Sequence, residues 1–435
     1  MQDLGARVLI CGLGETGQSA LRWLHAQGGY ELHLWDSRKQ PPVTAELAAL
    51  GQCHFALDSY ADLLSHCDWV LVSPGLPQDL PLLLEARRQG KPILSDIDVF
   101  ARAAQAPIVG VTGSNGKSTV VTALAAMARA AGLNAPAGGN LAPPALDILD
   151  PAADCYLLEL SSFQLEHSGA LPLAVGAVLN LSPDHLDRHG SMQAYAAAKA
   201  RILAAATVGV LRSDDDWVRA MHGAERTVHF AVEPSADYSL HDGQLWQGAQ
   251  PVCATAQLRL VGRHNHLNAL AAVAIADALG WDRSASLRGL EQFQGLEHRC
   301  EWVATHQGVT WINDSKGTNV GAVAAAVDGL DGPLLLLLGG QAKGGDFAPL
   351  VAPLKNKLRK VLVFGQDALT ILEQLRGELA VERVADLPAA VNRAASLAQS
   401  GDSVLLSPGC ASFDQFSGFV ERGQRFRDLV QQVTA

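Results

Sequence analysis

The stretch at residues 108–119, IVGVTGSNGKST, constrains the fold more than any other part of the chain. It opens with the apolar, mostly β-branched run 108–111, which is typical of a buried parallel strand. Small residues then continue as far as Gly116 and permit a sharp turn. From Lys117 onward, apolar residues recur at helical spacing. The stretch therefore predicts a strand, a tight turn and a helix in direct succession.

The start of this expected helix is suited to binding an anion. Backbone N–H groups at a helix start point outward unpaired, glycines allow a close approach, and Lys117 adds a full positive charge. A strict P-loop would carry glycine at position 111, where this chain has valine, so the cradle is a variant of the common pattern. We expect it to hold a polyphosphate, with Ser118 placed to reach a magnesium ion. The residues expected in the cradle are Gly113, Ser114, Asn115, Gly116, Lys117, Ser118 and Thr119.

Composition limits the class of protein and its partners. The chain has 435 residues, which suggests about three domains, and 48% of them are hydrophobic against 18% charged, a globular profile. Its net charge of −11 disfavours nucleic acid or an anionic membrane as a partner. No apolar run approaches the ~18 residues that a membrane span needs, so we expect no membrane insertion.

Two further features predict a cytoplasmic protein. From Met1 the chain runs directly into an apolar strand, without the basic and then apolar segment that directs export. Its seven cysteines are scattered and never in CxxC spacing, which favours reduced thiols over disulfides or zinc. We expect the chain to act as a monomer.

Residues 7–38 have the pattern of a dinucleotide-binding βαβ unit. A GxGxxG turn at Gly12, Gly14 and Gly17 follows an apolar strand, and Asp36 lies 19 positions beyond the last glycine. Taken alone, this unit would indicate an NAD-dependent dehydrogenase, but a uridine diphosphate would suit the same glycines equally well. A second strand, 69–72, ends in a Ser-Pro-Gly turn at 73–75, and ligands lie at such carboxyl ends in open α/β sheets.

Polar residues in the middle of the chain also follow expected strands. Glu159 ends an apolar strand, where an unpaired carboxylate would be costly, so a cation such as magnesium is expected beside it. Residues 138–140, Gly-Gly-Asn, are expected to form a loop, and the loop at 180–189 is dense in hydrogen-bonding groups. In the helix expected at 192–206, the composition around Lys199 alone would predict a solvent-exposed lysine.

The last part of the chain again alternates strands and helices. This alternation predicts a parallel sheet with right-handed crossovers and functional loops at its carboxyl edge. Residues 294–299 are expected to form a hinge that leads into this part, and the asparagines of the run 262–268 are expected to contact a ligand. The fold class that follows is α/β with three mostly parallel sheets.

Eight motifs, in order and over the whole chain, resemble those of the bacterial Mur ligases, and most nearly those of the member that adds D-glutamate to UDP-N-acetylmuramoyl-L-alanine. They are TGSNGKST, LELSSFQLE, NLSPDHLDRH, GRHNHLNALAA, LEHRCE, NDSKGTN, LGGQAKGGDF and LSPGCASFDQF. The resemblance implies three domains: a Rossmann-like UDP-binding domain at 1–95, a central P-loop-type ATP-binding domain at 96–295, and a Rossmann-like amino-acid-binding domain at 296–435.

The activity that the resemblance implies is ATP-driven amide synthesis. A substrate carboxylate would take the γ-phosphoryl group of ATP, and the amine of D-glutamate would attack the resulting acyl phosphate and release phosphate. Because a carboxylate is a poor electrophile and repels a phosphoryl donor, such a site must supply cations and positioning. ATP and two magnesium ions are the expected cofactors.

The resemblance also implies roles for individual residues. Lys117 would hold the β- and γ-phosphates, Ser118 and Glu159 the first magnesium ion, and His185 with a carbamylated Lys199 the second. The remaining ATP contacts would be Asn268, Arg299 and Asp314. The UDP-muramoyl substrate would contact Gly14, Thr16, Asp36, Arg38, Ser73, Gly75 and Asn140. D-glutamate would contact Thr318, Lys343, Ser412 and Phe419. Lys117, Asn140, His185 and Lys199 are the residues expected at the reaction centre.

Three alternatives remain at this point. A sister Mur ligase or a relative of folylpolyglutamate synthetase would share the central motifs, although the N-terminal GxGxxG unit argues against folate. An NAD-dependent oxidoreductase explains residues 7–38 but leaves TGSNGKST without a role. A nucleotide-gated binding protein without chemistry would require Glu159, His185 and Lys199 to be incidental.

Overall fold

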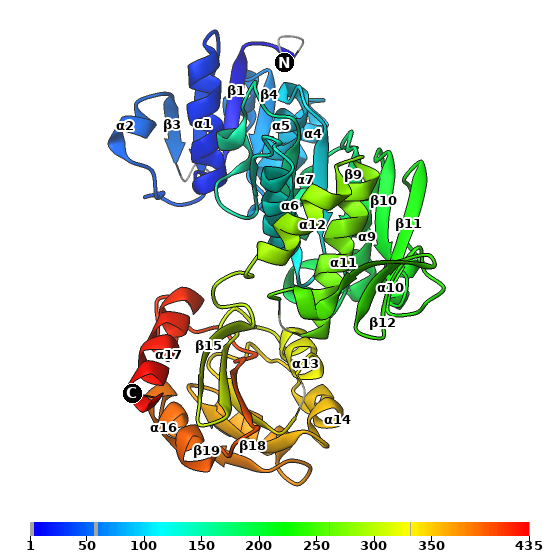
Figure 1. The fold of residues 1–435 in the computed structure, drawn as a ribbon. Coiled ribbons are helices and arrows are strands. Elements are labelled where there is room, and N and C mark those ends of the chain that lie inside the picture. Colours follow the sequence, from blue (N-terminus) through cyan, green and yellow to red (C-terminus); the bar gives the residue numbers. More distant parts are fainter. Residues whose placement is uncertain (1–3, 56–59, 261, 331, 435) are drawn as a thin grey trace.

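Three separate β-sheets follow one another along the chain, each with helices packed against it (Figure 1). The computed structural model describes residues 4–55, 60–260, 262–330 and 332–434. Residues 1–3, the first residues of the segment that we expect to lack an export signal, lie outside the described residues. The sheets have five, nine and six strands and are mostly parallel. The predicted α/β class with three sheets is confirmed.

The first sheet has the strand order β3-β2-β1-β4-β5, and all its pairings are parallel. Its central strand β1 is followed directly by helix α1, so the predicted ligand-binding end lies at the middle of the sheet. Gly17 is required there because a Cβ atom would lie 1.9 Å from the backbone oxygen of Gly12. The elements are β1 (Arg7–Cys11), α1 (Glu15–Gln27), β2 (Glu31–Asp36), α2 (Ala45–Ala48), β3 (Gln52–Phe55), α3 (Ala61–Ser65), β4 (Trp69–Val72), α4 (Pro81–Arg88) and β5 (Ile93–Ser95).

The second sheet places β6 between β8 and β9, with its carboxyl end facing the turn that leads into α6. The pairings are parallel from β7 across to β12, and β13 and β14 complete the sheet as antiparallel strands. The strands are β6 (Ile108–Thr112), β7 (Ala137–Gly139), β8 (Tyr156–Glu159), β9 (Val175–Val178), β10 (Val208–Arg212), β11 (Arg226–Ala231), β12 (Tyr238–His241), β13 (Gln244–Gln247) and β14 (Gln250–Ala254).

One helix of this middle part, predicted at residues 192–206, ends earlier than the sequence suggests. The helices are α5 (Asp96–Ala103), α6 (Lys117–Ala130), α7 (Ser162–His167), α8 (Leu186–His189), α9 (Met192–Ala200), α10 (Asp216–Arg219), α11 (Arg263–Ala278) and α12 (Arg283–Gln292), with 3-10 turns η2 (Ala145–Ile148), η3 (Arg201–Leu203) and η4 (Thr255–Gln257). The predicted helix 192–206 therefore ends early. Its chain tightens at η3, where the Arg201 guanidinium donates hydrogen bonds to the carbonyls of Leu165 and Ser168.

Residues 138–140 were expected to form a loop, and this prediction is wrong for the two glycines. Gly138 and Gly139 belong to β7, which pairs with β8 at the edge of the sheet. A Cβ atom at Gly139 would lie 2.5 Å from the backbone oxygen of Glu159. The glycine therefore serves a close approach of two strands rather than a turn, and Asn140 follows directly after the strand.

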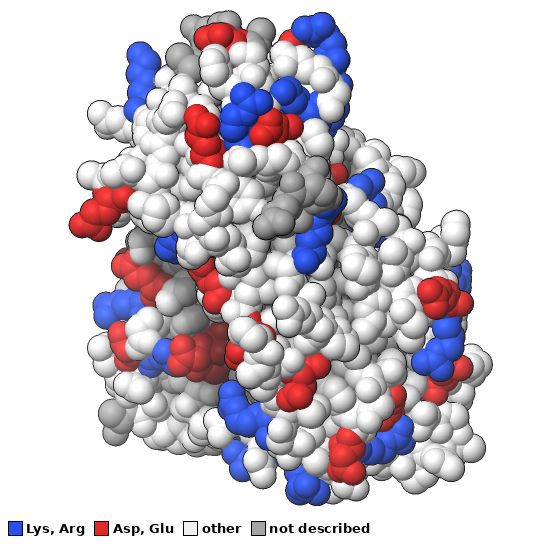
Figure 2. Space-filling model, turned by 90° about the horizontal axis from the view of Figure 1, so that it is seen from above, with Lys and Arg blue, Asp and Glu red and all other residues white. Residues whose placement is uncertain are grey.

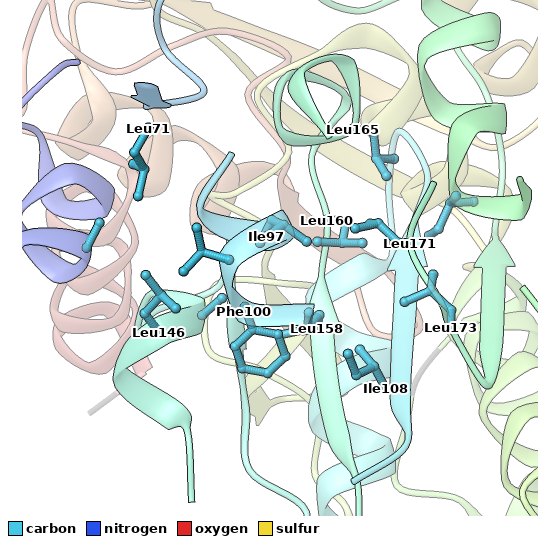
Figure 3. Close-up of a cluster of buried hydrophobic side chains, with 14 of the residues drawn as sticks. Leu71, Ile97, Phe100, Ile108, Leu146, Leu158, Leu160, Leu165, Leu171 and Leu173 are labelled. Atoms are coloured by element: carbon cyan, nitrogen blue, oxygen red, sulfur yellow. The ribbon is translucent and has the colours of Figure 1, made fainter. Parts of the chain in front are cut away.

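The first and second sheets share one hydrophobic core. Helix α5 contributes Ile97 and Phe100, which lie in the same cluster as Leu71 of β4 and Leu158 of β8 (Figure 3). The ring of Phe100 meets that of Tyr156 edge-on at 5.1 Å. Burial of apolar surface is stabilising whatever the orientation of the side chains, so this continuous cluster holds the first two sheets together as a unit.

The third sheet has the order β15-β16-β20-β17-β18-β19 and lies apart from the first two (Figure 1). Only β15 is antiparallel to its neighbour. One apolar cluster covers each face. The elements are β15 (Glu301–His306), β16 (Val309–Asn313), α13 (Val320–Asp328), β17 (Leu334–Gly339), η5 (Ala348–Leu350), α14 (Val351–Leu354), β18 (Leu358–Phe364), α15 (Ala368–Leu375), β19 (Val381–Arg383), α16 (Leu387–Leu397), β20 (Ser403–Leu406) and α17 (Phe419–Thr434).

The surface and the thiols agree with the compositional profile. On the face seen in Figure 2, acidic and basic side chains are interspersed rather than gathered into one large patch of a single sign. All seven cysteines are free, and all except Cys53 are buried. Among the described residues, no helix combines the length and apolar character required for a membrane span.

Candidate active site

The turn after β6 has the strand–turn–helix form expected of the predicted anion cradle. Gly116 has a φ of 87°, a conformation that favours glycine, and a Cβ atom there would lie 2.3 Å from Oδ1 of Asn268. The Lys117 ammonium folds back over the turn and donates to the backbone oxygens of Gly113 at 2.8 Å and Ser114 at 3.0 Å. Burial lowers the pKa of Lys117, and the carboxylate of Glu159 opposes this effect. The cradle is thus held in shape by its own lysine.

A clamp from the neighbouring strand end fixes the same turn. The Asn180 side chain accepts a hydrogen bond from the Asn115 amide and donates one to the Asn115 carbonyl, both at 2.9 Å. Ser114 Oγ lies 3.0 Å from the backbone oxygen of Ser182 and 3.1 Å from the Tyr195 hydroxyl. Sequence reasoning assigned no role to Asn180 or Tyr195. The signal for Asn180 was its position directly after a strand that neighbours β6.

Ser118, Glu159 and Asn140 meet beside the cradle, as the sequence predicted for a magnesium and substrate site. Ser118 Oγ donates to Glu159 Oε2 at 2.5 Å, and Asn140 Nδ2 donates to Glu159 Oε1 at 2.7 Å. Glu159 is buried at the end of β8. A carboxylate and a hydroxyl oxygen are ligands that magnesium prefers, so these residues fit the ion.

Lys199 is 1% exposed, so the exposure expected from its alanine-rich surroundings is wrong. Its Nζ lies 2.9 Å from the Gly113 carbonyl, 3.3 Å from Thr112 Oγ1 and 4.8 Å from the centre of the Tyr195 ring. Burial, followed by the nearby charge of Lys117, lowers the pKa of Lys199 well below its usual range. A lowered pKa favours the neutral amine, which is the form that can combine with carbon dioxide to give a carbamate.

His185 stands apart from this group. It has a φ of 52°, its side chain is half exposed, and its Nε2 lies 3.8 Å from Asp184 Oδ2. The His185 ring packs against Phe163 at 4.9 Å. Among the described residues, no three His, Cys, Asp or Glu side chains converge on one point, so the second magnesium site at His185 and Lys199 stays a prediction.

The segment that leads into the third sheet places a side chain against the cradle. Arg299, in the expected hinge, donates from Nη2 to Ser118 Oγ at 2.8 Å, and burial lowers its pKa. Asp314, which follows β16, accepts hydrogen bonds from the Cys300 amide at 3.2 Å and from Ser407 Oγ at 2.7 Å. Burial raises the pKa of Asp314 to about 6. Arg299 and Asp314 were both predicted as ATP contacts, and of the two it is Arg299 whose hydrogen bond reaches α6.

Lys316 is a partly buried residue that sequence reasoning missed. Its Nζ lies 3.9 Å from the centre of the Phe419 ring, at the start of α17. Burial lowers the pKa of Lys316 to about 8, and the positive charge of Arg299 acts in the same direction. The signal available in the sequence was its place in the motif NDSKGTN, between Asp314 and Thr318.

Apart from Asn140, which lies beside Glu159, the residues predicted for the UDP-muramoyl substrate lie around the start of α1 and in the turn after β4. Burial alone would raise the pKa of Asp36, but hydrogen bonds from the Arg38 side chain and the Leu13 amide hold it below its usual range. Ser73 Oγ donates to the Gly12 carbonyl at 2.7 Å. Three further members are open to ligands: Gly14 caps α1, Thr16 is half-buried in its first turn, and Gly75 is exposed.

The four residues predicted for D-glutamate are not assembled into one cluster. Thr318 and Lys343 are exposed, Ser412 is buried, and the Phe419 ring lies against Lys316. Within the described residues, no hydrogen bond or ion pair joins any two of them. The loops that carry Lys343 and Ser412 do meet, because backbone hydrogen bonds pair Gln341 with Ala411.

Family models match the chain along most of its length. Residues 6–95 match the Mur ligase MurD-like N-terminal domain, residues 111–276 the Mur ligase middle domain, and residues 298–410 the Mur ligase glutamate ligase domain. The chain belongs to the Mur ligase family. This family carries the three-sheet plan, and the cradle of this Mur ligase lies within the stretch matched by the middle domain.

Curated relatives of this Mur ligase extend the likeness to full length. The chain is 45% identical over 440 residues to the UDP-N-acetylmuramoylalanine--D-glutamate ligase of Methylococcus capsulatus, covering 99% of this chain and 96% of the relative. It is 43% identical over 437 residues to the protein of the same name from Escherichia coli strain K12, covering 99% of both. These two chains therefore align from end to end with this one.

Solved structures confirm the fold of this Mur ligase. A pseudomurein peptide ligase type C from Methanothermus fervidus superposes with a TM-score of 0.64 at 19% identity, covering 99% of this chain and 100% of the other. MurF ligase from Thermotoga maritima, solved in complex with ADP, superposes with a TM-score of 0.61 at 16% identity, covering 99% and 96%. At this level of identity the likeness concerns the fold alone.

Proposed function

We propose that this chain adds D-glutamate to UDP-N-acetylmuramoyl-L-alanine with hydrolysis of ATP to ADP and phosphate, a step in peptidoglycan precursor synthesis. The observation that carries the proposal is the 45% identity over nearly the full length of both chains to D-glutamate ligases of that substrate. Mur ligases are ATP-dependent enzymes that form amide bonds. The cluster around Lys117 and Glu159 is the part of this chain suited to that chemistry.

The reaction begins with activation of the substrate carboxylate. Its oxygen attacks the γ-phosphorus of ATP, ADP leaves, and an acyl phosphate forms. The amine of D-glutamate then attacks the acyl carbon, and phosphate leaves from the tetrahedral intermediate as the amide forms. All the reacting groups except the amine are anionic, so positive charge and fixed geometry are what the protein must supply.

Lys117 and Arg299 supply that charge. Lys117 now bonds the cradle carbonyls and would transfer its hydrogen bonds to the β- and γ-phosphates. Arg299 reaches Ser118 from the segment that leads into the third sheet and would neutralise charge on the transferring phosphoryl group. Asn268, against Gly116, and Asp314 would contact the adenine and the ribose.

Ser118 and Glu159 would hold the first magnesium ion, and His185 with a carbamylated Lys199 would hold a second. Magnesium supplies charge neutralisation between the phosphates of ATP and the incoming carboxylate. The burial of Lys199 and its lowered pKa support carbamylation, because a lowered pKa favours the neutral amine that reacts with carbon dioxide. The carbamate would turn this lysine into an anionic oxygen ligand. Asn140, bonded to Glu159, would orient the substrate carboxylate beside the same ion.

The two ends of the acceptor complex would lie on different sheets. The uridine diphosphate would contact the residues around α1, namely Gly14, Thr16, Asp36, Arg38, Ser73 and Gly75. D-glutamate would contact Thr318, Lys343, Ser412 and Phe419, with the Lys343 ammonium pairing a carboxylate. The domain bounds 1–95, 96–295 and 296–435 belong to this proposal, together with a monomeric state and a cytoplasmic location.

Phosphate release by the purified chain tests the function. With ATP, Mg²⁺ and UDP-N-acetylmuramoyl-L-alanine held fixed, we expect release to depend on D-glutamate and to remain near background with L-glutamate, L-alanine, L-lysine or meso-diaminopimelate. Faster release with another of these amino acids would assign the chain to a sister ligase. Phosphate release at the same rate with and without UDP-N-acetylmuramoyl-L-alanine would overturn the proposal.

A further inference from the structure

Arg188 bridges the first and second sheets next to the candidate active site. It lies in α8, three residues after His185, and its side chain is 19% exposed. Its Nη2 donates to the Leu76 carbonyl at 2.7 Å, and its Nη1 lies 3.4 Å from the Gly75 carbonyl. The same Nη2 lies 3.1 Å from Glu166 Oε2 of α7. The guanidinium thus joins the turn after β4 to the loop that carries His185.

The turn after β4 is held on the second sheet by more than Arg188. His167 Nε2 lies 2.8 Å from the Leu76 carbonyl, and Gln78 Nε2 donates to the Glu166 carbonyl. Gly75 itself has no neighbour within 4 Å of where a Cβ atom would stand, so its ligand-facing side is free. A molecule that binds at this turn therefore contacts a segment whose backbone oxygens are already bonded to the second sheet.

On its other side, Arg188 belongs to a series of tilted ring contacts that leads to the cradle. Its guanidinium carbon lies 5.1 Å from the centre of the Phe163 ring, which packs against His185 at 4.9 Å and His189 at 5.6 Å. The His189 ring lies 5.3 Å from that of Tyr195. The Tyr195 hydroxyl lies 3.1 Å from Ser114 Oγ, within the anion cradle. These contacts form a continuous chain from Gly75 to the phosphate site.

We propose that Arg188 is a positioning residue that couples acceptor binding at the turn of residues 73–76 to the geometry of the phosphate and metal site. The inference rests on the proposed function and deepens it. It explains how binding of the acceptor, UDP-N-acetylmuramoyl-L-alanine, would change the geometry of the phosphate and metal site. Occupancy of the turn fixes the carbonyls of Gly75 and Leu76, and their bonds to Arg188 fix the Phe163 and His185 rings. By reciprocity, nucleotide bound in the cradle tightens acceptor binding by the same factor.

The chemistry of the contact requires arginine. A guanidinium has donors in a planar fork, so it can bond two carbonyls and a carboxylate at once while its face stacks on Phe163. A lysine ammonium would keep the charge but would lose the fork and most of the stacking. Arg188→Lys should therefore retain only part of the coupling, and Arg188→Met should retain none.

Arg22 offers a matched control at the same boundary. Its Nη2 bonds Asp147 Oδ2 at 2.8 Å, which also joins the first sheet to the second, but the pair is near η2 rather than near the predicted site. Arg22→Met removes one arginine between the sheets, as Arg188→Met does. A role of Arg188 in holding the sheets together would make the two variants behave alike, whereas a positioning role would not.

Calorimetric titration of the full chain tests the proposal. The affinity of a non-hydrolysable ATP analogue with Mg²⁺ is measured with and without saturating UDP-N-acetylmuramoyl-L-alanine. For the wild type and Arg22→Met we expect the acceptor to tighten analogue binding about fivefold or more, a typical coupling between sites. For Arg188→Met we expect a ratio near one, and for Arg188→Lys an intermediate ratio. In turnover, Arg188→Met should raise KM for the acceptor and the Mg²⁺ requirement while leaving KM for D-glutamate unchanged.

The outcomes separate this inference from the proposed function. A wild-type ratio near one, an unchanged ratio in Arg188→Met, or equal loss in Arg188→Met and Arg22→Met would overturn the coupling. If Arg188→Met does not fold, the Arg188→Lys ratio decides, and a wild-type value there would overturn it. A wild type that shows the coupling but releases no phosphate with D-glutamate would instead refute the proposed function and leave the coupling standing.

Discussion

The phosphate cradle and the predicted D-glutamate site lie at the carboxyl edges of neighbouring sheets but differ in how far they are assembled. Around the cradle, hydrogen bonds of 2.5–2.8 Å join Ser118, Glu159, Asn140 and Arg299. Among the four D-glutamate residues, within the described part of the chain, no such bond exists, and Thr318 and Lys343 face solvent. One site is a network before any ligand binds, and the other is a set of separate side chains.

The difference indicates at which site substrate binding has to be accompanied by a rearrangement of the protein. A network that already satisfies its polar groups can receive ATP by exchanging partners, with little reorganisation. If the four predicted residues bind D-glutamate, they must be brought together by the ligand itself or by rotation of the third sheet and its helices toward the cradle. The hinge run at 294–299 and the few polar contacts between the sheets, such as Asn319 to Asp184 at 3.3 Å, are consistent with such a rotation.

Replacing Lys117 should have the largest effect, because the cradle depends on its charge. Lys117→Met should lower kcat for phosphate release by about 1,000-fold or more, since it removes a cation from the transferring phosphates. Lys355→Met is the control, because that lysine pairs with Glu378 in an exposed position. If Lys117→Met retained a tenth of the wild-type rate, the cradle would not be the phosphate site.

Lys199 tests whether the buried part of the cradle holds a second metal ion. Lys199→Ala should lower the rate about 100-fold, the scale of losing a metal contact, and added acetate or another short carboxylic acid should restore part of it by filling the space of the carbamate. The readout is the rate against carboxylate concentration at saturating Mg²⁺. A variant with full activity would exclude the carbamate, and a loss that no carboxylate relieves would indicate a packing role instead.

Lys343 tests the less assembled site. Lys343→Met should raise KM for D-glutamate by about 10- to 100-fold, the scale of a lost charged hydrogen bond, while KM for ATP stays constant. The control is Lys360→Met, whose ammonium bonds Glu382 at 3.1 Å on a strand of the same sheet. An equal rise in KM for ATP would mean that the two sites are not separable in the way the contacts indicate.

Asp314 should give the smallest effect, visible as a pH dependence. Burial raises its pKa to about 6, so the carboxylate is ionised above that pH and protonated below it. An ionised carboxylate accepts hydrogen bonds from the ribose hydroxyls more strongly, so KM for ATP should rise about fivefold as the pH falls from 8 to below 6. In Asp314→Asn, KM should be raised at both pH values and nearly flat between them, whereas Asp328→Asn should follow the wild type.

The sequence predicted the strand, turn and helix of the cradle because these parts are local. The strand, the turn and the start of the helix occupy twelve consecutive residues, 108–119, and the turn glycines and Lys117 lie within them. Glu159 was predicted for a similar reason, since a carboxylate at the end of an apolar strand requires a partner. The three-sheet α/β class followed from alternation of strand and helix patterns along the chain.

Features that depend on contacts between distant segments were not predictable. Lys199 looked exposed because its alanine neighbours give the helix no polar face, and only the position of Gly113 and Thr112 explains its burial. Residues 138–139 looked like a loop because glycine favours turns, whereas here it permits close strand pairing. Arg188 and Lys316 lie in recognisable motifs, but their contacts could not be inferred from those motifs, since their partners belong to other elements.

Binding measured by calorimetry on the full chain, one ligand at a time, tests the contrast between the two sites most directly. We expect the Mg²⁺ complex of a non-hydrolysable ATP analogue to bind the free chain, and D-glutamate to bind only when that analogue and UDP-N-acetylmuramoyl-L-alanine are already present. Equal affinity of D-glutamate for the free and the loaded chain would contradict the account, because the amino-acid site would then be assembled in advance.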